Sequence, residues 1–317
     1  MNLESKFKEM MEDYDRYAWI PVGLLVLSFV MMGAGYMQNG KVLQLGQDFT
    51  GGTTVRLNMT QDFDTAQVDQ IFSSEGQQGS SSIRIDSGET SVLEVTVPPP
   101  KLNRSQILNI MNSNSVRSYS LDDADVLSLN FSKKELAETL RTIATWTFIL
   151  AFTIMSLVIF TSFRDLVPSA AVIFAAGADV IFSVGVMSLV GIPLTPGSLS
   201  ALLMLIGYSV DTDIVLSSRV LKQKRGSLED RMWSAAKTGV TMSSGGVAGF
   251  TILYLVSVAI VGPSTLSMVA SVMVIGLLAD MPFTWFGNAY ILQKYQRDEL
   301  GVEEKIDEYA DRVNIWN

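Results

Sequence analysis

Four aspartates lie in stretches of the chain that are otherwise apolar enough to cross a membrane: Asp179, Asp211, Asp213 and Asp280. A carboxylate in hydrocarbon costs about 3 kcal/mol on insertion scales, so such a group usually lines an interior path or binds a proton or an ion. The chain has no histidine and no cysteine, and carboxylates must therefore perform any proton transfer. We predict an ion-coupling or proton-coupling site among these four acids.

Asp211 and Asp213 are two residues apart, which places them about 200° apart around a helix. Only one of the two can face the centre of a helix bundle. Asp213 is the closer to the basic segment that follows, so the deeper Asp211 ranks first as the proton site and Asp213 second. Asp179 and Asp280 are candidate neighbours on adjoining helices. The alternative for each acid is a hydrogen bond that holds the bundle together without any ion.

Two basic residues flank the same end of the helices that follow these acids. Arg219 and Lys237 are possible charge partners, although eight residues separate Arg219 from Asp211, about 12 Å of helical rise. That distance is too long for a direct salt bridge. The alternative role for both is to anchor the helix ends at the cytoplasmic surface.

Runs without charged residues define the elements that position the acids. About 20 apolar residues cross a bilayer, and the Gly-Pro breaks near residues 191–197 and 262–264 divide the two longest runs. The fold class is therefore a polytopic α-helical membrane protein. Its six transmembrane helices are expected at 18–37, 142–162, 166–190, 197–219, 239–261 and 264–292. In the fifth helix, Gly245 and Gly249 form a ridge of small residues that favours close helix packing.

Loop charges predict the orientation. The loop 220–237 is basic, so it and both terminal tails, 1–17 and 293–317, are expected in the cytoplasm. The first helix is expected to be an uncleaved anchor, because the tail before it is more acidic than basic. The large segment 38–141 then lies outside the cell.

Segment 38–141 has the pattern of an α+β domain. Strand-like and helix-like stretches alternate in the order βαββαβ, which is typical of a ferredoxin-like antiparallel sheet covered by helices on one face. The stretches are 53–58, 64–73, 82–86, 91–97, 104–111 and 116–130. Just before them lies a juxtamembrane turn that contains Asp48, Phe49, Gly51 and Gly52, and this turn lacks the glycine spacing of a phosphate-binding loop.

The composition excludes several classes of protein. With 48% hydrophobic and 17% charged residues, the chain is too apolar for an ordinary soluble domain, and the lipid bilayer is its expected surrounding. A net charge of −9 argues against nucleic acid as a partner. Because histidine and cysteine are absent, no disulfide, no zinc or haem site, and no other cofactor or metal is expected.

Three stretches together carry a family resemblance: LGQDFTGGT at 45–53, LLMLIGYSVDTDIVLSSRV at 202–220 and AAKTGVTMSSGG at 235–246. The chain resembles SecF, a subunit of the Sec protein-export apparatus in the resistance-nodulation-division superfamily, and looks like its archaeal branch. Where that family usually has its acid, this chain has Thr212. Asp211 instead falls where the partner subunit SecD has its own intramembrane aspartate, and Lys237 replaces a common arginine.

The resemblance implies a function in the cell membrane. SecF pairs with SecD, and ion flow, driven by the proton-motive force, moves the outer domains so that they assist polypeptides translocating through the Sec channel. Two other functions remain open: a proton-coupled exporter of lipids or small hydrophobic molecules, and an intramembrane aspartyl protease that uses Asp211 or Asp213 with Asp280. The usual GxGD setting of such proteases is absent around Asp280, and we expect no enzymatic activity.

Overall fold

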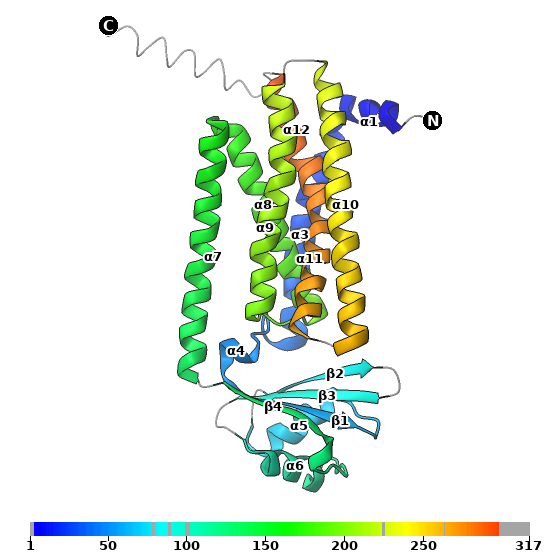
Figure 1. The fold of residues 1–317 in the computed structure, drawn as a ribbon, viewed down its shortest axis with the longest axis vertical. Coiled ribbons are helices and arrows are strands. Elements are labelled where there is room, and N and C mark those ends of the chain that lie inside the picture. The colour runs from blue at the N-terminus through cyan, green and yellow to red at the C-terminus, as the bar shows by residue number, and fades with distance from the viewer. Residues whose placement is uncertain are drawn as a thin grey trace, which may run out of the picture.

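The computed structural model describes residues 3–77, 80–87, 90–98, 102–132, 134–223, 226–262 and 264–297. It consists of a bundle of long helices with an α/β domain at one end (Figure 1). Helices α1 (Leu3–Glu12) and α12 (Ala289–Gln296) lie at the opposite end, which we call the distal end.

Within the described residues, six helical stretches are long and apolar enough to cross a membrane. Three of them, α8, α9 and α11, have half of their most apolar window buried, whereas α3, α7 and α10 lie at the periphery. The six are α3 (Trp19–Asn39), α7 (Lys134–Phe163), α8 (Leu166–Val190), α9 (Pro196–Ser217), α10 (Leu228–Val261) and α11 (Thr265–Pro282), which continues through the π-helical turn η3 (Phe283–Asn288) into α12.

Several helices extend beyond the charge-free runs. Helix α10 begins at Leu228 rather than 239, and α7 begins at Lys134 rather than 142. A helix continues into the polar region wherever its backbone hydrogen bonds are retained, and a capping box at Ser227 starts α10. The expected tail 1–17 contains two helices, α1 and α2 (Tyr14–Tyr17), while most of the expected tail 293–317 lies outside the described residues.

Small residues let the central helices approach closely. A Cβ atom on Gly185 of α8 would lie 2.9 Å from the backbone oxygen of Ser28 on α3, and one on Gly276 of α11 would lie 2.3 Å from the side chain of Leu205 on α9. Apolar side chains of α8, α9 and α11 fill the space between these contacts, including the fully buried Val172 and Met273. The centre of the bundle is therefore closely packed.

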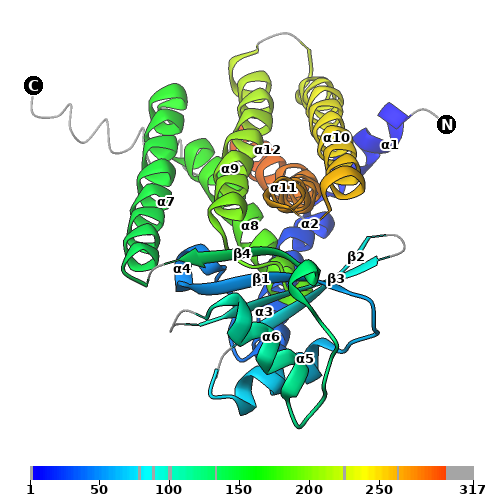
Figure 2. The ribbon, with the colours of Figure 1, turned by 60° about the horizontal axis from the view of Figure 1, so that its bottom comes forward.

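The α/β domain contains a four-stranded sheet in the order β2-β3-β1-β4, in which all neighbouring strands are antiparallel. Helices α5 and α6 cover one of its faces (Figure 2). The elements are β1 (Gly52–Met59), α5 (Thr65–Ser74), β2 (Ser81–Ser87), β3 (Thr90–Val97), α6 (Arg104–Ser113), the 3-10 turn η1 (Asp123–Asp125) and β4 (Val126–Ser132). Alternate residues of β1, such as Val55 and Leu57, are fully buried under the helices. Of the expected stretch 116–130, only the part from Val126 onward is a strand.

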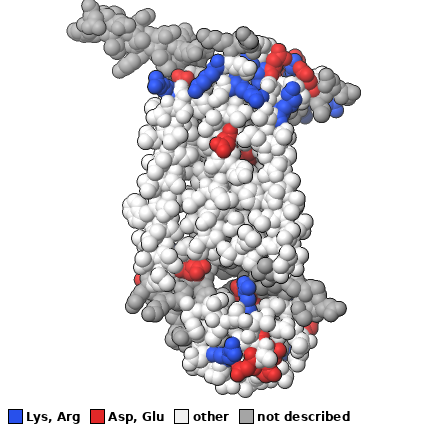
Figure 3. All heavy atoms as spheres, in the orientation of Figure 1, with Lys and Arg blue, Asp and Glu red and all other residues white. Residues whose placement is uncertain are grey.

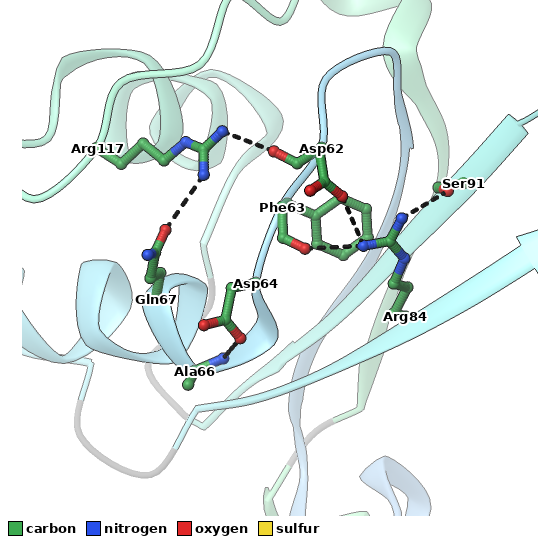
Figure 4. Close-up of polar contacts among 8 residues, drawn as sticks. All are labelled: Asp62, Phe63, Asp64, Ala66, Gln67, Arg84, Ser91 and Arg117. Atoms are coloured by element: carbon green, nitrogen blue, oxygen red, sulfur yellow. Dashed lines mark hydrogen bonds and ion pairs between the residues drawn. The ribbon is translucent and has the colours of Figure 1, made fainter.

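Two arginines organise the end of β1 and the start of α5 (Figure 4). Arg84 donates to the Asp62 carboxylate at 2.8 Å and to the Phe63 carbonyl at 3.0 Å, while Arg117 donates to the Asp62 carbonyl at 2.7 Å and to Gln67. The Arg84 guanidinium holds the pKa of the Asp62 carboxyl below its usual value. These contacts fix the loop that joins β1 to α5.

A buried acidic cluster as the candidate functional site

Each of the three central helices contributes one aspartate to the interior of the bundle. Asp179 lies on α8, Asp213 on α9 and Asp280 on α11, and all three have an exposed fraction of 0%. We call these three residues the acidic cluster. The sequence predicted all three as ion-coupling candidates, and the fold brings them together.

Hydroxyl groups provide most of the donors to the cluster. Ser209 Oγ donates to Asp179 Oδ2 at 2.6 Å. Thr284 Oγ1 lies 2.9 Å from Asp213 Oδ1 and 3.2 Å from Asp280 Oδ1, so a single proton serves two acceptors. Because one hydroxyl donates to one oxygen at a time, the second acceptor needs another donor.

Two further side chains complete the surroundings of the cluster. Ser243 Oγ of α10 donates to Asp280 Oδ2 at 3.2 Å, and Asn288 Nδ2 donates to Asp213 Oδ1 at 2.8 Å. The buried oxygens Asp179 Oδ1 and Asp213 Oδ2 have no hydrogen-bond partner. Both unsatisfied atoms are acceptors, so the cluster lacks donors rather than acceptors.

The deficit of donors restricts the charge that the cluster can carry. None of the donors that reach the three carboxyl groups is a lysine or an arginine, and burying several unpaired carboxylates costs several kcal/mol for each. Asp179 and Asp280 are both fully buried, and each accepts a hydrogen bond from a serine on a neighbouring helix. Among the described residues, no group of three or more carboxylates is arranged to hold a metal ion. A carboxyl group that is buried without a basic partner can be neutralised by binding a proton.

Helical spacing explains how these polar residues meet. Asp280, Thr284 and Asn288 are separated by four residues each, so they follow one face of the last membrane helix. The π-helical turn η3 begins directly after Pro282, which supplies no backbone N–H. Thr284 and Asn288 were not predicted as site residues from the sequence, although their spacing from Asp280 places them on the same helix face.

Asp211, which the sequence ranks first as the proton site, does not join the acidic cluster. Its side chain is exposed on the outer surface of α9, while Ser209 and Asp213 of the same helix are fully buried. The rotation of about 200° between positions 211 and 213 is the physical reason, because the packed face of α9 contains Asp213. Its neighbour Gly207 has open space beside it.

Neither candidate basic partner reaches the acidic cluster. Arg219 donates to Ser234 Oγ at 2.7 Å and to the Ser234 carbonyl, which ties the end of α9 to α10. Lys237 is exposed, and its Nζ lies 5.6 Å from the centre of the Trp233 ring. Among the described residues, neither base forms an ion pair with an intramembrane aspartate, in line with the distance estimated for Arg219 from the sequence.

The juxtamembrane turn joins the bundle to the α/β domain. Gly46 N donates to the Leu194 carbonyl at 2.7 Å, and Leu194 N donates to the Gln44 carbonyl at 2.7 Å, so the turn is paired with the loop between α8 and α9. A Cβ atom on Gly46 would lie 2.5 Å from Thr195, which caps α9. This contact needs a glycine and fixes the turn to the start of the helix that carries Asp213.

The turn continues through the short helix α4 (Gln47–Thr50) into β1. Phe49 is buried, whereas Asp48 is exposed. Gly51 and Gly52 have φ values of 72° and 119°, and a Cβ atom on Gly52 would lie 2.2 Å from the Val97 carbonyl oxygen of β3. The two glycines therefore form a compact joint that leads directly into the sheet.

The family model described as "Protein export membrane protein SecD/SecF, C-terminal" matches residues 112–298, which is more than half of the chain. The chain belongs to the SecD/SecF family. Among its curated relatives, the protein-export membrane protein SecF of Methanocaldococcus jannaschii is 31% identical over 90% of this chain and 97% of that protein. SecF of Methanothermobacter thermautotrophicus is 52% identical, over 47% of this chain and 53% of that protein.

A solved SecDF structure shares the fold. The crystal structure of SecDF from Thermus thermophilus, a translocon-associated membrane protein, superposes with a TM-score of 0.70 and 20% identity. The match covers 90% of this chain but 38% of that longer chain. At 20% identity the similarity shows that the two chains share a fold. The description of the acidic cluster rests on the side chains of this chain.

Proposed function

We propose that this chain is a SecF-like subunit that assists protein export by coupling ion movement at the acidic cluster to movement of the α/β domain. One observation supports this coupling: the three central helices bring together three fully buried carboxyl groups, and none of these groups has a basic partner. The relatives that match along most of the chain are named protein-export membrane protein SecF, which supports the export role. The function is transport rather than catalysis.

The structure suggests a mechanical route between the two parts. Protonation or deprotonation changes the charge of the cluster, and the helices must shift to satisfy the new charge. Asp213 lies on α9, and the capping residue of this helix, Thr195, packs against Gly46. A displacement of α9 would therefore move Gly46, and the chain that follows Gly46 would carry this movement to α4 and β1.

The coupling ion in this proposal is the proton. The hydroxyl groups beside Asp179 and Asp280 accept as well as donate hydrogen bonds.

A second part of the proposal concerns the partner. Asp211 is exposed in a membrane-spanning helix, and no neighbouring side chain lies near Gly207 on α9 or near Gly245 and Gly249 on α10. The expected small-residue ridge is therefore not packed within this chain. We place the membrane helices of SecD on this face, where the glycines allow close approach and a SecD side chain can pair with Asp211.

The proposed orientation follows from charge. The α/β domain, a ferredoxin-like fold by its strand order, lies outside the cell membrane near the exit of the Sec channel, where translocating polypeptides emerge. On the face shown in Figure 3, basic side chains lie at the distal end and on the domain. The part of the bundle between these two regions shows no basic side chain on this face. Both termini then lie in the cytoplasm.

Export into membrane vesicles that contain the Sec channel, SecD and this chain tests the proposal. Asp213→Asn should abolish the stimulation of export by a proton gradient, while the variant still co-purifies with SecD. Asp165→Asn, the same change at an exposed position before α8, is the matched control and should keep full stimulation. Full stimulation in Asp213→Asn would exclude the coupling role.

A further inference from the structure

An apolar pocket of about 670 Å³ opens at the distal end of the bundle. It lies between α1, one face of α10, and the segment where α11 becomes η3. Aromatic and aliphatic side chains form most of its walls, among them Met10, Trp233, Val240 and Trp285. A pocket of this size is in the range that binds small molecules in proteins.

The pocket lies at the expected boundary of the hydrocarbon core. Lys237 lines the pocket and precedes the last residue of α10, Val261, by 24 residues, which is about 36 Å of helical rise. The hydrocarbon core is about 30 Å thick, so a helix that begins at its far surface passes out of it close to Lys237. Tryptophan and lysine side chains are typical of this boundary.

Lys237 is the one charged side chain among the lining residues. It is exposed, its Nζ rests over the Trp233 ring, and it is absent from the ion pairs of the described residues. An apolar pocket with a single cation at the membrane surface matches an amphiphile with an apolar chain and an anionic headgroup. A neutral ligand or an apolar helix would leave the lysine without a partner.

We propose that this pocket binds a phospholipid with an anionic headgroup. One acyl chain lies against Met10, Trp233 and Trp285, and the phosphate contacts Lys237. The lipid is drawn from the leaflet that surrounds the distal end, so no further molecule is required.

The occupant would contact the segment that completes the acidic cluster. Trp285 belongs to η3, and its carbonyl accepts a hydrogen bond from the buried Tyr14 hydroxyl. The residue before it, Thr284, donates to the cluster. The lipid therefore packs against the turn that positions Thr284, although the binding proposal does not depend on ion coupling.

Quenching of tryptophan fluorescence by brominated lipids tests the proposal. Trp19→Phe, Trp146→Phe and Trp316→Phe leave Trp233 and Trp285 as the only fluorophores of this type. The purified chain is placed in phosphatidylcholine nanodiscs that contain either phosphatidylglycerol or phosphatidylcholine with brominated acyl chains. We expect about fivefold stronger apparent binding of the anionic lipid, which corresponds to about 1 kcal/mol for one basic residue near an anionic lipid.

Substitutions at the lysine separate a specific site from general lipid contact. Lys237→Gln should remove the preference for phosphatidylglycerol, and Lys237→Arg should keep it. Lys222→Gln is the matched control, because Lys222 is also exposed and lies over an aromatic ring, that of Phe163, but does not line the pocket. Equal quenching by both lipids in the parent, weak quenching by both, or an unchanged preference in Lys237→Gln would overturn the proposal.

Discussion

Replacing Thr284 with valine removes the hydroxyl that lies between two carboxyl groups and keeps the shape of the side chain. In the structure this hydroxyl is 2.9 Å from Asp213 Oδ1 and 3.2 Å from Asp280 Oδ1. Asp213 Oδ1 keeps its bond from Asn288, so the variant loses one hydrogen bond and leaves Asp280 with fewer donors. A buried acceptor without a donor costs about 1–3 kcal/mol.

Thermal unfolding of the purified chain measures this loss. We expect Thr284→Val to lower the free energy of unfolding by about 1–3 kcal/mol, which lowers Tm by roughly 2 °C for each kcal/mol in a chain of this size. Thr153→Val is the control, since Thr153 faces outward on α7 and its hydroxyl donates only within its own helix. That variant should unfold at the parent temperature.

A double-mutant cycle decides whether the effect passes through the cluster. Thr284→Val combined with Asp213→Asn should show a coupling of about 0.5–3 kcal/mol, while Thr153→Val with Asp213→Asn should show none. A Thr284→Val variant as stable as the control, or a cycle with no coupling, would refute the hydrogen-bonded arrangement that we describe.

Three other outcomes are expected. Asp211→Asn should leave the stability of the isolated chain unchanged but weaken co-purification with SecD, because Asp211 is exposed on the proposed partner face. Unchanged co-purification would argue against that face. Gly46→Ala should loosen the joint and speed hydrogen exchange in residues 46–50, because the added methyl collides with Thr195, while Gly33→Ala has open space and should change nothing. Arg84→Gln should lower the stability of the α/β domain at pH 7, and this difference from the parent should shrink below about pH 4. The reason is that the pKa of Asp62 is lower in the folded state than in the unfolded state, so the stabilisation from the Arg84–Asp62 pair is lost as the pH falls. A difference independent of pH would mean that Arg84 acts through packing alone.

Much of the bundle could be read from the sequence, because hydrophobic length reports membrane helices directly. The six expected spans overlap the six helices of the structure. Their ends were harder to predict, since α10 begins at Leu228, eleven residues before the expected start at 239, and includes polar residues. A charge-free run marks the apolar surrounding of a helix rather than the limits of its hydrogen bonding.

The composition of the site was easier to predict than its geometry. The absence of histidine pointed to aspartates, and three of the four candidates meet in the bundle. The sequence could not show which of Asp211 and Asp213 faces the core, because their spacing shows only that the two side chains point in different directions. The packed face of α9 is decided by its contacts with α8 and α11, which involve residues distant in the sequence.

Infrared spectroscopy of the purified chain tests most directly whether the three buried aspartates, rather than Asp211, hold a proton. At neutral pH the parent should show the carbonyl absorption of a protonated carboxyl group, because three fully buried carboxyl groups meet there and none of the donors that reach them is a lysine or an arginine. Asp211→Asn should retain this absorption, and the double variant Asp179→Asn with Asp280→Asn should lose it. A parent without the absorption, or its loss in Asp211→Asn alone, would contradict the account.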